Sequence, residues 1–423
     1  MKKKVLATVL SAAMAVSMMA GCGQKAAEPA AAPATEAAAP AAEPAPAPEP
    51  EPAPEPEPAA TEEAAAEPAE EPAAAATEGE YTAGTPFSGI TAKEAYKFPI
   101  DVKSFQSTYW QAALAGMDIA KAELGVDYDA HGPNSESDIA DQVNMLNSDI
   151  NSNPPGIGLA ACDTSSVLDS LQTCADKGIP VVCFDTGVAD APEGSVVCTV
   201  ATDNAQAGEV AADNMYAALA DVIANAEGQV RIGEINQDAT ALNIQQRGLG
   251  FINEMIALIQ ADGKTVSVEG NEFYVNAAEG ADSGDTDVVI EVQVPAQTTV
   301  ELCSAQAQAI LSKADTIGVF GSNQTAAEGL LAADANLSLL GSDPEAGDVI
   351  GVGFDAGSII KGAVASGQMY GAVTQSPLMM GYYTLYALTA AANGDPVEDY
   401  PTDGYWYDAS NIDDPTIAPN LYD

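Results

Sequence analysis

Two carboxylates occupy matching places in the sequence, each directly after an apolar run that ends in Phe. Asp185 follows Val-Val-Cys-Phe, and Asp355 follows Gly-Val-Gly-Phe. An ionised carboxylate only accepts hydrogen bonds, so two of them suit a ligand that presents hydroxyl groups. Asp is also a favoured helix N-cap, and for either residue alone both interpretations stand. The repetition of the Phe-Asp ending favours ligand binding.

A scarce basic residue and two aromatic residues offer complementary chemistry. Arg247 lies in Gln-Gln-Arg-Gly, in a stretch otherwise rich in Leu, Ile and Phe. Its planar fork can hold two adjacent hydroxyls or offset nearby carboxylates, and the alternative is an ordinary surface Arg. The faces of Tyr109 and Trp110 can stack on the C–H surface of a sugar ring, and the alternative is a place in the core.

These residues lie in a regular alternation of short apolar runs and amphipathic stretches that begins near residue 95. Strands are expected at residues 96–102, 126–130, 156–160, 180–184, 196–200, 229–235, 265–269, 288–294, 316–320, 349–353 and 370–374. Helices are expected at residues 109–124, 137–151, 165–177, 205–226, 242–261, 299–313, 325–333, 358–366 and 378–392. This alternation predicts an α/β fold with parallel sheets, in two doubly wound lobes. Ligands of such sheets bind beyond the carboxyl ends of the strands, where Asn323 and Gln375 also fall.

The charge of the chain excludes several classes of function. The 423 residues include 62 acidic and 14 basic residues, which gives a net charge of −48. Such a surface does not suit nucleic acid, whose phosphates require Lys and Arg. The single histidine, His131, argues against His-rich zinc sites and against a Ser-His-Asp triad. Its His-Gly-Pro-Asn context predicts a turn residue.

Further chemical signatures are missing from the sequence. The Gly351-x-Gly353 pair is not followed by the third Gly of a dinucleotide-binding loop. The Cys residues beyond position 22 form no Cys-x-x-Cys pair and lie mostly in apolar runs, so we expect buried thiols and no disulfides. We therefore expect no enzyme, no metal and no cofactor.

The N-terminus predicts export and lipid attachment. Residues 1–21 combine a Lys-rich start with an apolar stretch too short to span a membrane, which is typical of a signal peptide. The stretch ends in Met-Ala-Gly-Cys, which looks like a bacterial lipobox and would make Cys22 the lipidated residue. The alternative is an ordinary signal peptide with a chance Cys. Residues 22–80 are rich in Ala, Pro and Glu and lack Leu, Ile, Val and aromatic residues, so we expect a disordered stalk.

Short motifs between residues 95 and 395 occur in a recognisable order. They are the Gly-Ile-Pro-Val-Val-Cys-Phe-Asp that ends at Asp185, Thr202-Asp203-Asn204 with Gly208, Arg247-Gly248 with Gly250-Phe251, Ser322-Asn323, the Val-Gly-Phe-Asp that ends at Asp355, and Thr374-Gln375 with Gly381. Their order resembles that of the type I periplasmic sugar-binding proteins, the ribose/galactose-binding family of ABC importers. The resemblance implies that sugar hydroxyls are hydrogen-bonded by Asp185, Arg247, Asn323, Asp355 and Gln375, and that the ring is sandwiched by Tyr109 and Trp110.

Three departures from the family pattern leave the particular sugar open. Ser-Thr-Tyr-Trp stands at 107–110 where ribose binders commonly have Asn-Pro-Phe-Phe. Thr186 replaces a frequent Arg, and segment 270–297 is longer and more acidic than the family suggests. From the sequence we expect Asp185→Ala to abolish sugar binding with little effect on stability.

The resemblance also implies two lobes joined by a three-segment hinge. One lobe would take residues 92–204 and 375–398, and the other residues 205–374 and 399–423. Contacts from both lobes would close the hinge around a sugar for delivery to the permease and ATPase of an ABC importer. We expect a monomer outside the cytoplasm, attached to the bacterial cell membrane through lipid alone. The alternative is a sensor module that presents a sugar, autoinducer or nucleoside to a receptor.

Overall fold

The computed structural model describes residue 82 and residues 84–415 and 417–422. These residues belong to one compact unit. The expected signal peptide, Cys22 and stalk lie outside the described residues. No helix in the described part of the chain has both the length and the apolar character needed to cross a membrane.

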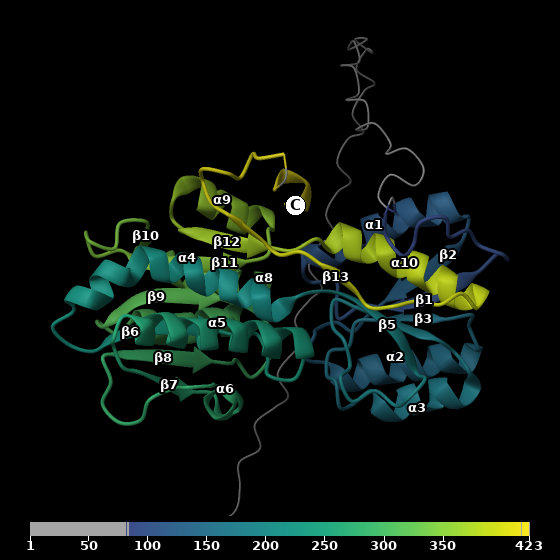
Figure 1. The fold of residues 1–423 in the computed structure, drawn as a ribbon, viewed down its shortest axis with the longest axis horizontal. Helices are drawn as coiled ribbons and strands as arrows, with labels where there is room; N and C mark the ends of the chain where they lie inside the picture. The colour runs from purple at the N-terminus through teal and green to yellow at the C-terminus, as the bar shows by residue number, and fades with distance from the viewer. Residues whose placement is uncertain (1–81, 83, 416, 423) are drawn as a thin grey trace, which may run out of the picture. The chain divides into compact units, whose positions relative to one another are not determined.

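The first of two sheets has six strands, and all neighbouring strands in it are parallel. The strands are β1 (Lys97–Asp101), β2 (Asp127–His131), β3 (Ile157–Leu159), β4 (Val181–Phe184), β5 (Val196–Thr202) and β13 (Tyr400–Thr402). The covering helices are α1 (Thr108–Leu124), α2 (Ile139–Ser152), α3 (Leu168–Lys177) and α10 (Pro377–Asn393). Helices α1 and α10 pack together on one face, and α2 and α3 on the other (Figure 1). We call this sheet with its helices the first lobe.

The second sheet with its helices forms the second lobe. Its strands are β6 (Val230–Ile235), β7 (Val266–Gly270), β8 (Val288–Gln293), β9 (Thr316–Gly321), β10 (Leu340–Gly341), β11 (Val349–Phe354), β12 (Gly371–Thr374) and β14 (Tyr405–Tyr407). Its helices are α4 (Asn204–Asn225), α5 (Leu242–Ala261), α6 (Glu272–Ala277), α7 (Val300–Leu311), α8 (Gln324–Asp334) and α9 (Ser358–Ser366). Helices α4 and α5 share one hydrophobic core with the sheet, and α7, α8 and α9 share another. Among the described strands of this sheet, β14 alone is antiparallel to its neighbour.

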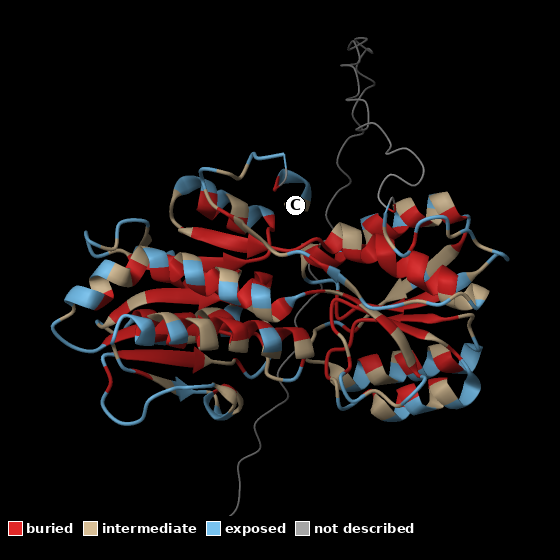
Figure 2. Cartoon of the chain, in the orientation of Figure 1, coloured by how far each residue is buried: buried red, intermediate tan, exposed pale blue. Residues whose placement is uncertain are grey.

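Both sheets have the strand order of a doubly wound fold. In the first, β1 lies between β2 and the series β3, β4 and β5, and in the second, β6 lies between β8 and the series β9, β11 and β12. The reversal of order at β1 and at β6 opens a crevice beyond the carboxyl ends of the strands. The central strands are buried beneath helices whose outer faces are exposed, whereas the edge strands β2 and β7 are partly exposed, and each lobe has its own core (Figure 2).

Glycines allow the paired helices of each lobe to approach closely. A Cβ on Gly381 of α10, or on Gly116 of α1, would lie 1.8 Å from a backbone oxygen of the facing helix. A Cβ on Gly208 of α4, or on Gly250 of α5, would lie 2.2 Å from a backbone oxygen of its facing helix. A methyl group fits at none of these distances, so these four positions require glycine.

The expected two-lobed α/β fold is confirmed, and each strand and helix expected from the sequence is present. Five short elements were not expected, namely β10, α6, β13, β14 and the 3₁₀ helix Ala418–Asn420. The chain passes between the sheets after β5, after β12 and between β13 and β14. The third passage was expected after residue 398, but Tyr400–Thr402 still pairs with β5, so it falls a few residues later.

The described cysteines agree with the expectation of buried thiols. All of them are buried and free of disulfides: Cys162, Cys174, Cys183, Cys198 and Cys303.

Candidate functional site

Residues that follow the strands of both sheets line one cavity of about 30 Å³. The chain reaches it just after β1 and β4 in the first lobe, and just after β6, β9, β11 and β12 in the second. The structure brings together here all the binding residues expected from the sequence, namely Tyr109, Trp110, Asp185, Arg247, Asn323, Asp355 and Gln375.

Asp185 follows β4 and is only 4% exposed. Its Oδ1 accepts a hydrogen bond from the hydroxyl of Tyr109 at 2.7 Å, and its Oδ2 accepts one from Nδ2 of Asn243 at 3.0 Å. Nζ of Lys103 lies 3.2 Å from the same Oδ2. The chain continues from Asp185 to β5 without a helix, so the N-cap interpretation is wrong for this residue.

Asp355 follows β11 and is as deeply buried as its counterpart. Its Oδ2 accepts the backbone N–H of Gln324 at 2.9 Å, and its Oδ1 accepts Nε2 of Gln375 at 2.7 Å. The next helix, α9, has Gly357 as its N-cap, so Asp355 does not cap the helix that follows it. Burial raises the pKa of Asp355 above its usual value, and the nearby guanidinium of Arg247 opposes this rise.

Arg247 is buried inside the second lobe, so the surface interpretation is wrong. It is 1% exposed, and its guanidinium carbon lies 3.6 Å from the centre of the Phe354 ring. Nη1 donates to the backbone oxygen of Ser322 at 2.8 Å, and Nη2 donates to Oδ1 of Asn204 at 2.6 Å. Its buried Nε has no hydrogen-bond partner among the described residues. An unpaired donor in a residue that lines the cavity can serve a ligand oxygen.

The two aromatic residues line the cavity and also belong to the core of the first lobe. The rings of Tyr109 and Trp110 meet edge to face, with centres 5.0 Å apart. Nε1 of Trp110 donates to Oε1 of Glu136 at 3.1 Å. Both interpretations of these residues are therefore correct. Their rings pack in the core, while their polar atoms hydrogen-bond to Asp185 and Glu136, which line the cavity.

The amides of Asn323 and Gln375 connect the cavity to helix and hinge. Oδ1 of Asn323 caps α8 by accepting the N–H of Ala326 at 3.0 Å. Oε1 of Gln375 accepts the hydroxyl of Thr202 at 3.0 Å, and Oγ1 of Thr402 lies 3.1 Å from that hydroxyl. Because Thr202 has one hydroxyl hydrogen, Thr402 is the donor in the second bond. This chain of hydrogen bonds joins the segments in which the polypeptide passes between the lobes.

Further residues line the cavity that were not among the expected binding residues, and they include Lys103, Glu136, Gln237, Asn243 and Gln324. The rule that ligands bind at strand ends could have found Lys103 and Gln237, which come two residues after β1 and β6. Asn243 lies one helical turn before Arg247 on the same face of α5. Burial disfavours the charged form of Lys103, but Asp185 and Glu136 outweigh it and raise the pKa of Lys103, so the ammonium stays protonated.

Hydrogen bonds between side chains of the two lobes close the cavity. Oγ of Ser107 donates to Oε1 of Gln324 at 2.6 Å, and Nε2 of Gln237 donates to Oε2 of Glu136 at 2.6 Å. The cavity has room for one or two water molecules. The two lobes thus fill most of the space between them with their own polar groups.

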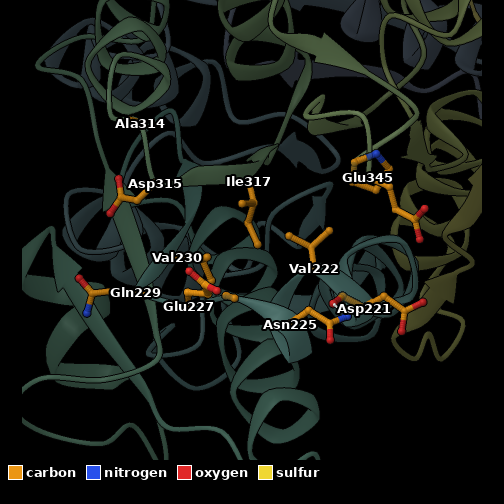
Figure 3. A pocket seen from close by; sticks show the side chains of 13 residues that line it. Asp221, Val222, Asn225, Glu227, Gln229, Val230, Ala314, Asp315, Ile317 and Glu345 are labelled. Atoms are coloured by element: carbon orange, nitrogen blue, oxygen red, sulfur yellow. Dashed lines mark hydrogen bonds between the residues drawn. The ribbon is translucent and has the colours of Figure 1, made fainter.

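A larger hollow of about 740 Å³ lies elsewhere, where α4 ends and β6 and β9 begin (Figure 3). Its polar side chains are mostly acidic and include Asp221, Glu227, Asp315 and Glu345. It lies at the amino ends of its strands, whereas doubly wound sheets bind ligands at the carboxyl ends. We therefore place the candidate site in the cavity between the lobes.

Two doubly wound lobes with a polar cavity between their strand ends define the architecture of a two-lobed ligand-binding protein. Residues 98–396 match the family model described as "Periplasmic binding protein domain". The chain belongs to this family, which confirms the resemblance inferred from the motifs.

Solved structures show the same fold. A chain from Brachyspira murdochii, described as an ABC transporter, LacI family transcriptional regulator, is 28% identical, with a TM-score of 0.64 over 78% of this chain and 99% of that one. An ABC transporter solute-binding protein from Agrobacterium vitis with bound D-fucose is 24% identical, with a TM-score of 0.64 over 77% and 100% of the two chains. A carbohydrate transporter solute-binding protein from Agrobacterium radiobacter in complex with D-arabinose is 24% identical, with a TM-score of 0.63 over 78% and 100%. A search of curated proteins found no match.

Proposed function

We propose that this chain is an extracytoplasmic lipoprotein that captures a monosaccharide between its lobes and delivers it to an ABC importer. The observation that carries the proposal is that Asp185 and Asp355, from opposite lobes, line one cavity together with Arg247 and two aromatic residues. Carboxylates accept from sugar hydroxyls, the guanidinium donates to sugar oxygens, and aromatic faces cover the apolar side of the ring. Structural neighbours with bound D-fucose and D-arabinose support the same ligand class.

Capture requires the lobes to separate and close again. A cavity of about 30 Å³ is smaller than a monosaccharide, so a sugar must replace the hydrogen bonds that now join the lobes. A ligand that contacts both lobes stabilises the closed form by the free energy of those contacts. A permease can then distinguish the closed, loaded protein from the open one.

The proposed export and membrane attachment rest on the N-terminal sequence. The signal peptide is removed at residue 21, Cys22 carries the lipid, and residues 22–80 hold the lobes away from the membrane. The protein works as a monomer with the permease and ATPase of its importer, and binds neither nucleic acid nor cofactor.

The proposal is tested by measuring the thermal stability of the full-length chain with pentoses, hexoses, inositols and nucleosides. At least one sugar should raise the melting temperature, and calorimetry should give a 1:1 complex. Asp355→Asn should lower the affinity at least tenfold, because it removes a charged acceptor (about 1.5–3 kcal/mol). Glu345→Gln changes an exposed carboxylate at the other hollow and should have no effect. Failure of every sugar to bind would overturn the proposal.

A further inference from the structure

Away from the cleft, the first lobe holds the single histidine of the sequence between two carboxylates. His131 was expected in a turn, but it is the last residue of β2 and pairs with Asp101 at the end of β1. Asp149 reaches the same place from α2. Nε2 of His131 lies 2.7 Å from Oδ2 of Asp149 and 3.1 Å from Oδ1 of Asp101. Three potential metal-ligand atoms therefore converge on one point.

One ring nitrogen cannot satisfy both carboxylates. Nε2 of His131 carries at most one hydrogen, and the contact with Asp149 is the hydrogen bond. Asp101 is 0% exposed, and neither of its carboxylate oxygens makes a hydrogen bond within the described part of the chain. A buried carboxylate without a hydrogen bond is costly, because a nearby imidazolium that donates its hydrogen elsewhere replaces only part of the lost hydration. Nε2 of His131 lies 3.1 Å from Oδ1 of Asp101 and is its cationic partner when the imidazole is protonated, but it gives its hydrogen to Asp149.

We propose that Asp101, His131 and Asp149 bind one divalent transition-metal ion, with Zn²⁺ as the ion that fits best. The three ligand atoms lie within 4.8 Å of one another. An imidazole nitrogen with carboxylate oxygens is a typical ligand set for Zn²⁺, whereas Ca²⁺ and Mg²⁺ prefer oxygen ligands alone. Two carboxylates balance the charge of a dication, and direct coordination would supply the carboxylate of Asp101 with the bond that it lacks among the described residues.

The surroundings give an ion a path to this site. His131 and Asp149 line a surface hollow of about 740 Å³, and acidic side chains of Glu94 and Asp129 line it as well. A water molecule from the hollow can fill the fourth position of a tetrahedral ion. The bound ion would link β1, β2 and α2. Its ligand Asp101 lies two residues before Lys103, which lines the ligand cavity.

The test uses the full-length chain after treatment with EDTA, titrated with ZnCl₂ in a calorimeter. We expect one Zn²⁺ per chain and a higher melting temperature in its presence. Asp149→Asn and His131→Gln should each weaken binding at least tenfold. Asp129→Asn is the matched control, because it removes an exposed carboxylate of the same hollow that lies outside the three-residue cluster.

A cobalt spectrum separates this site from binding at cysteine. Co²⁺ held by nitrogen and oxygen gives visible bands without the near-ultraviolet band of a thiolate ligand. The proposal is overturned if the EDTA-treated chain binds no Zn²⁺, if Asp149→Asn and His131→Gln bind it as tightly as the unchanged chain, or if the thiolate band appears.

Discussion

Asp185 and Asp355 share an unusual backbone conformation, with φ angles of 60° and 73°. Positive φ is uncommon outside glycine, although Asp and Asn tolerate it better than other residues. Each Asp comes directly after a buried strand that ends in Phe, so the two lobes present the same local structure to the cavity. Replacement by Ala would add strain of about 1–2 kcal/mol, whereas Asn keeps the local preference. Asn is therefore the better substitution at both positions.

The ion pair between Lys103 and Asp185 should dominate the stability effect of a change at Asp185. Their side chains are 2% and 4% exposed, so removing one charge leaves the other buried and uncompensated. We expect Asp185→Asn to lower the free energy of unfolding by about 3–5 kcal/mol. This revises the expectation from the sequence that such a change leaves stability nearly unaltered.

A double variant isolates the contribution of the charge. Lys103→Met combined with Asp185→Asn should regain more than half of the loss, because both charges of the pair are removed and Glu136, which also faces Lys103, keeps its hydrogen bonds from Trp110 and Gln237. Guanidinium unfolding of the unchanged chain, both single variants and the double variant measures this. A double variant as unstable as Asp185→Asn alone would contradict the explanation.

Two helical glycines, one in the contact between α1 and α10 and one on an open helix surface, should respond in opposite ways to substitution by Ala. Gly381→Ala forces a methyl group to within 1.8 Å of a backbone oxygen in α1, so the helices must move apart. We expect a loss of about 1–3 kcal/mol in the free energy of unfolding. Gly362→Ala, in α9, meets nothing within 4 Å and should gain about 0.5–1 kcal/mol through helix propensity. Chemical denaturation of both variants tests the pair, and a loss at position 362 equal to that at 381 would refute the packing argument.

Glu234 should make stability depend on pH. It is completely buried in β6, and its Oε2 has no hydrogen-bond partner among the described residues. Burial raises the pKa of Glu234 well above its usual value of 4.5, and the hydrogen bond from Asn236 only partly opposes this. The folded protein therefore holds the proton more tightly than the unfolded chain. Stability from this group is full below the unfolded pKa and is lost as the pH rises towards the folded pKa.

Glu234→Gln removes this loss because the amide does not ionise. The melting temperature of the variant, relative to the unchanged chain, should therefore increase between about pH 5 and about pH 8. Thermal melts over this range provide the measurement. A difference that stays constant with pH would show that Glu234 does not titrate in the folded protein in this way.

The hydroxyl of Thr202 should couple the hinge to the ligand site. It bonds Gln375, whose Nε2 holds Asp355, and it also bonds Thr402. Thr202→Val keeps the branched shape but breaks the chain, so we expect a several-fold loss of sugar affinity and about 1–2 kcal/mol of stability. Thr384→Val is the matched control, because it removes a buried hydroxyl in α10 that donates to the backbone oxygen of Met380, away from the cavity. Calorimetry should show lower sugar affinity for Thr202→Val alone, and equal affinities would exclude the coupling.

The sequence predicted the location of a site residue wherever that location depends only on the end of a single strand. Asp185 and Asp355 could be placed because parallel strands bring their carboxyl ends to one edge, and the Phe-Asp pattern marks those ends. The partners of Asp185 could not be predicted in this way. Lys103 follows β1, which β3 separates from β4 in the sheet, and Asn243 reaches the carboxylate from the other lobe. Their positions therefore depend on strand order and on how whole lobes face each other. The surface interpretation of Arg247 failed for the same reason.

The hydrogen bonds from Ser107 to Gln324 and from Gln237 to Glu136 also limit how fast a ligand can be captured. A sugar cannot push into the filled cavity, so it must wait until these bonds break by themselves. The observed association rate should then rise with sugar concentration only up to the rate of opening, and become constant beyond it. The side chains that close the cleft therefore set the maximum rate of the first step of uptake.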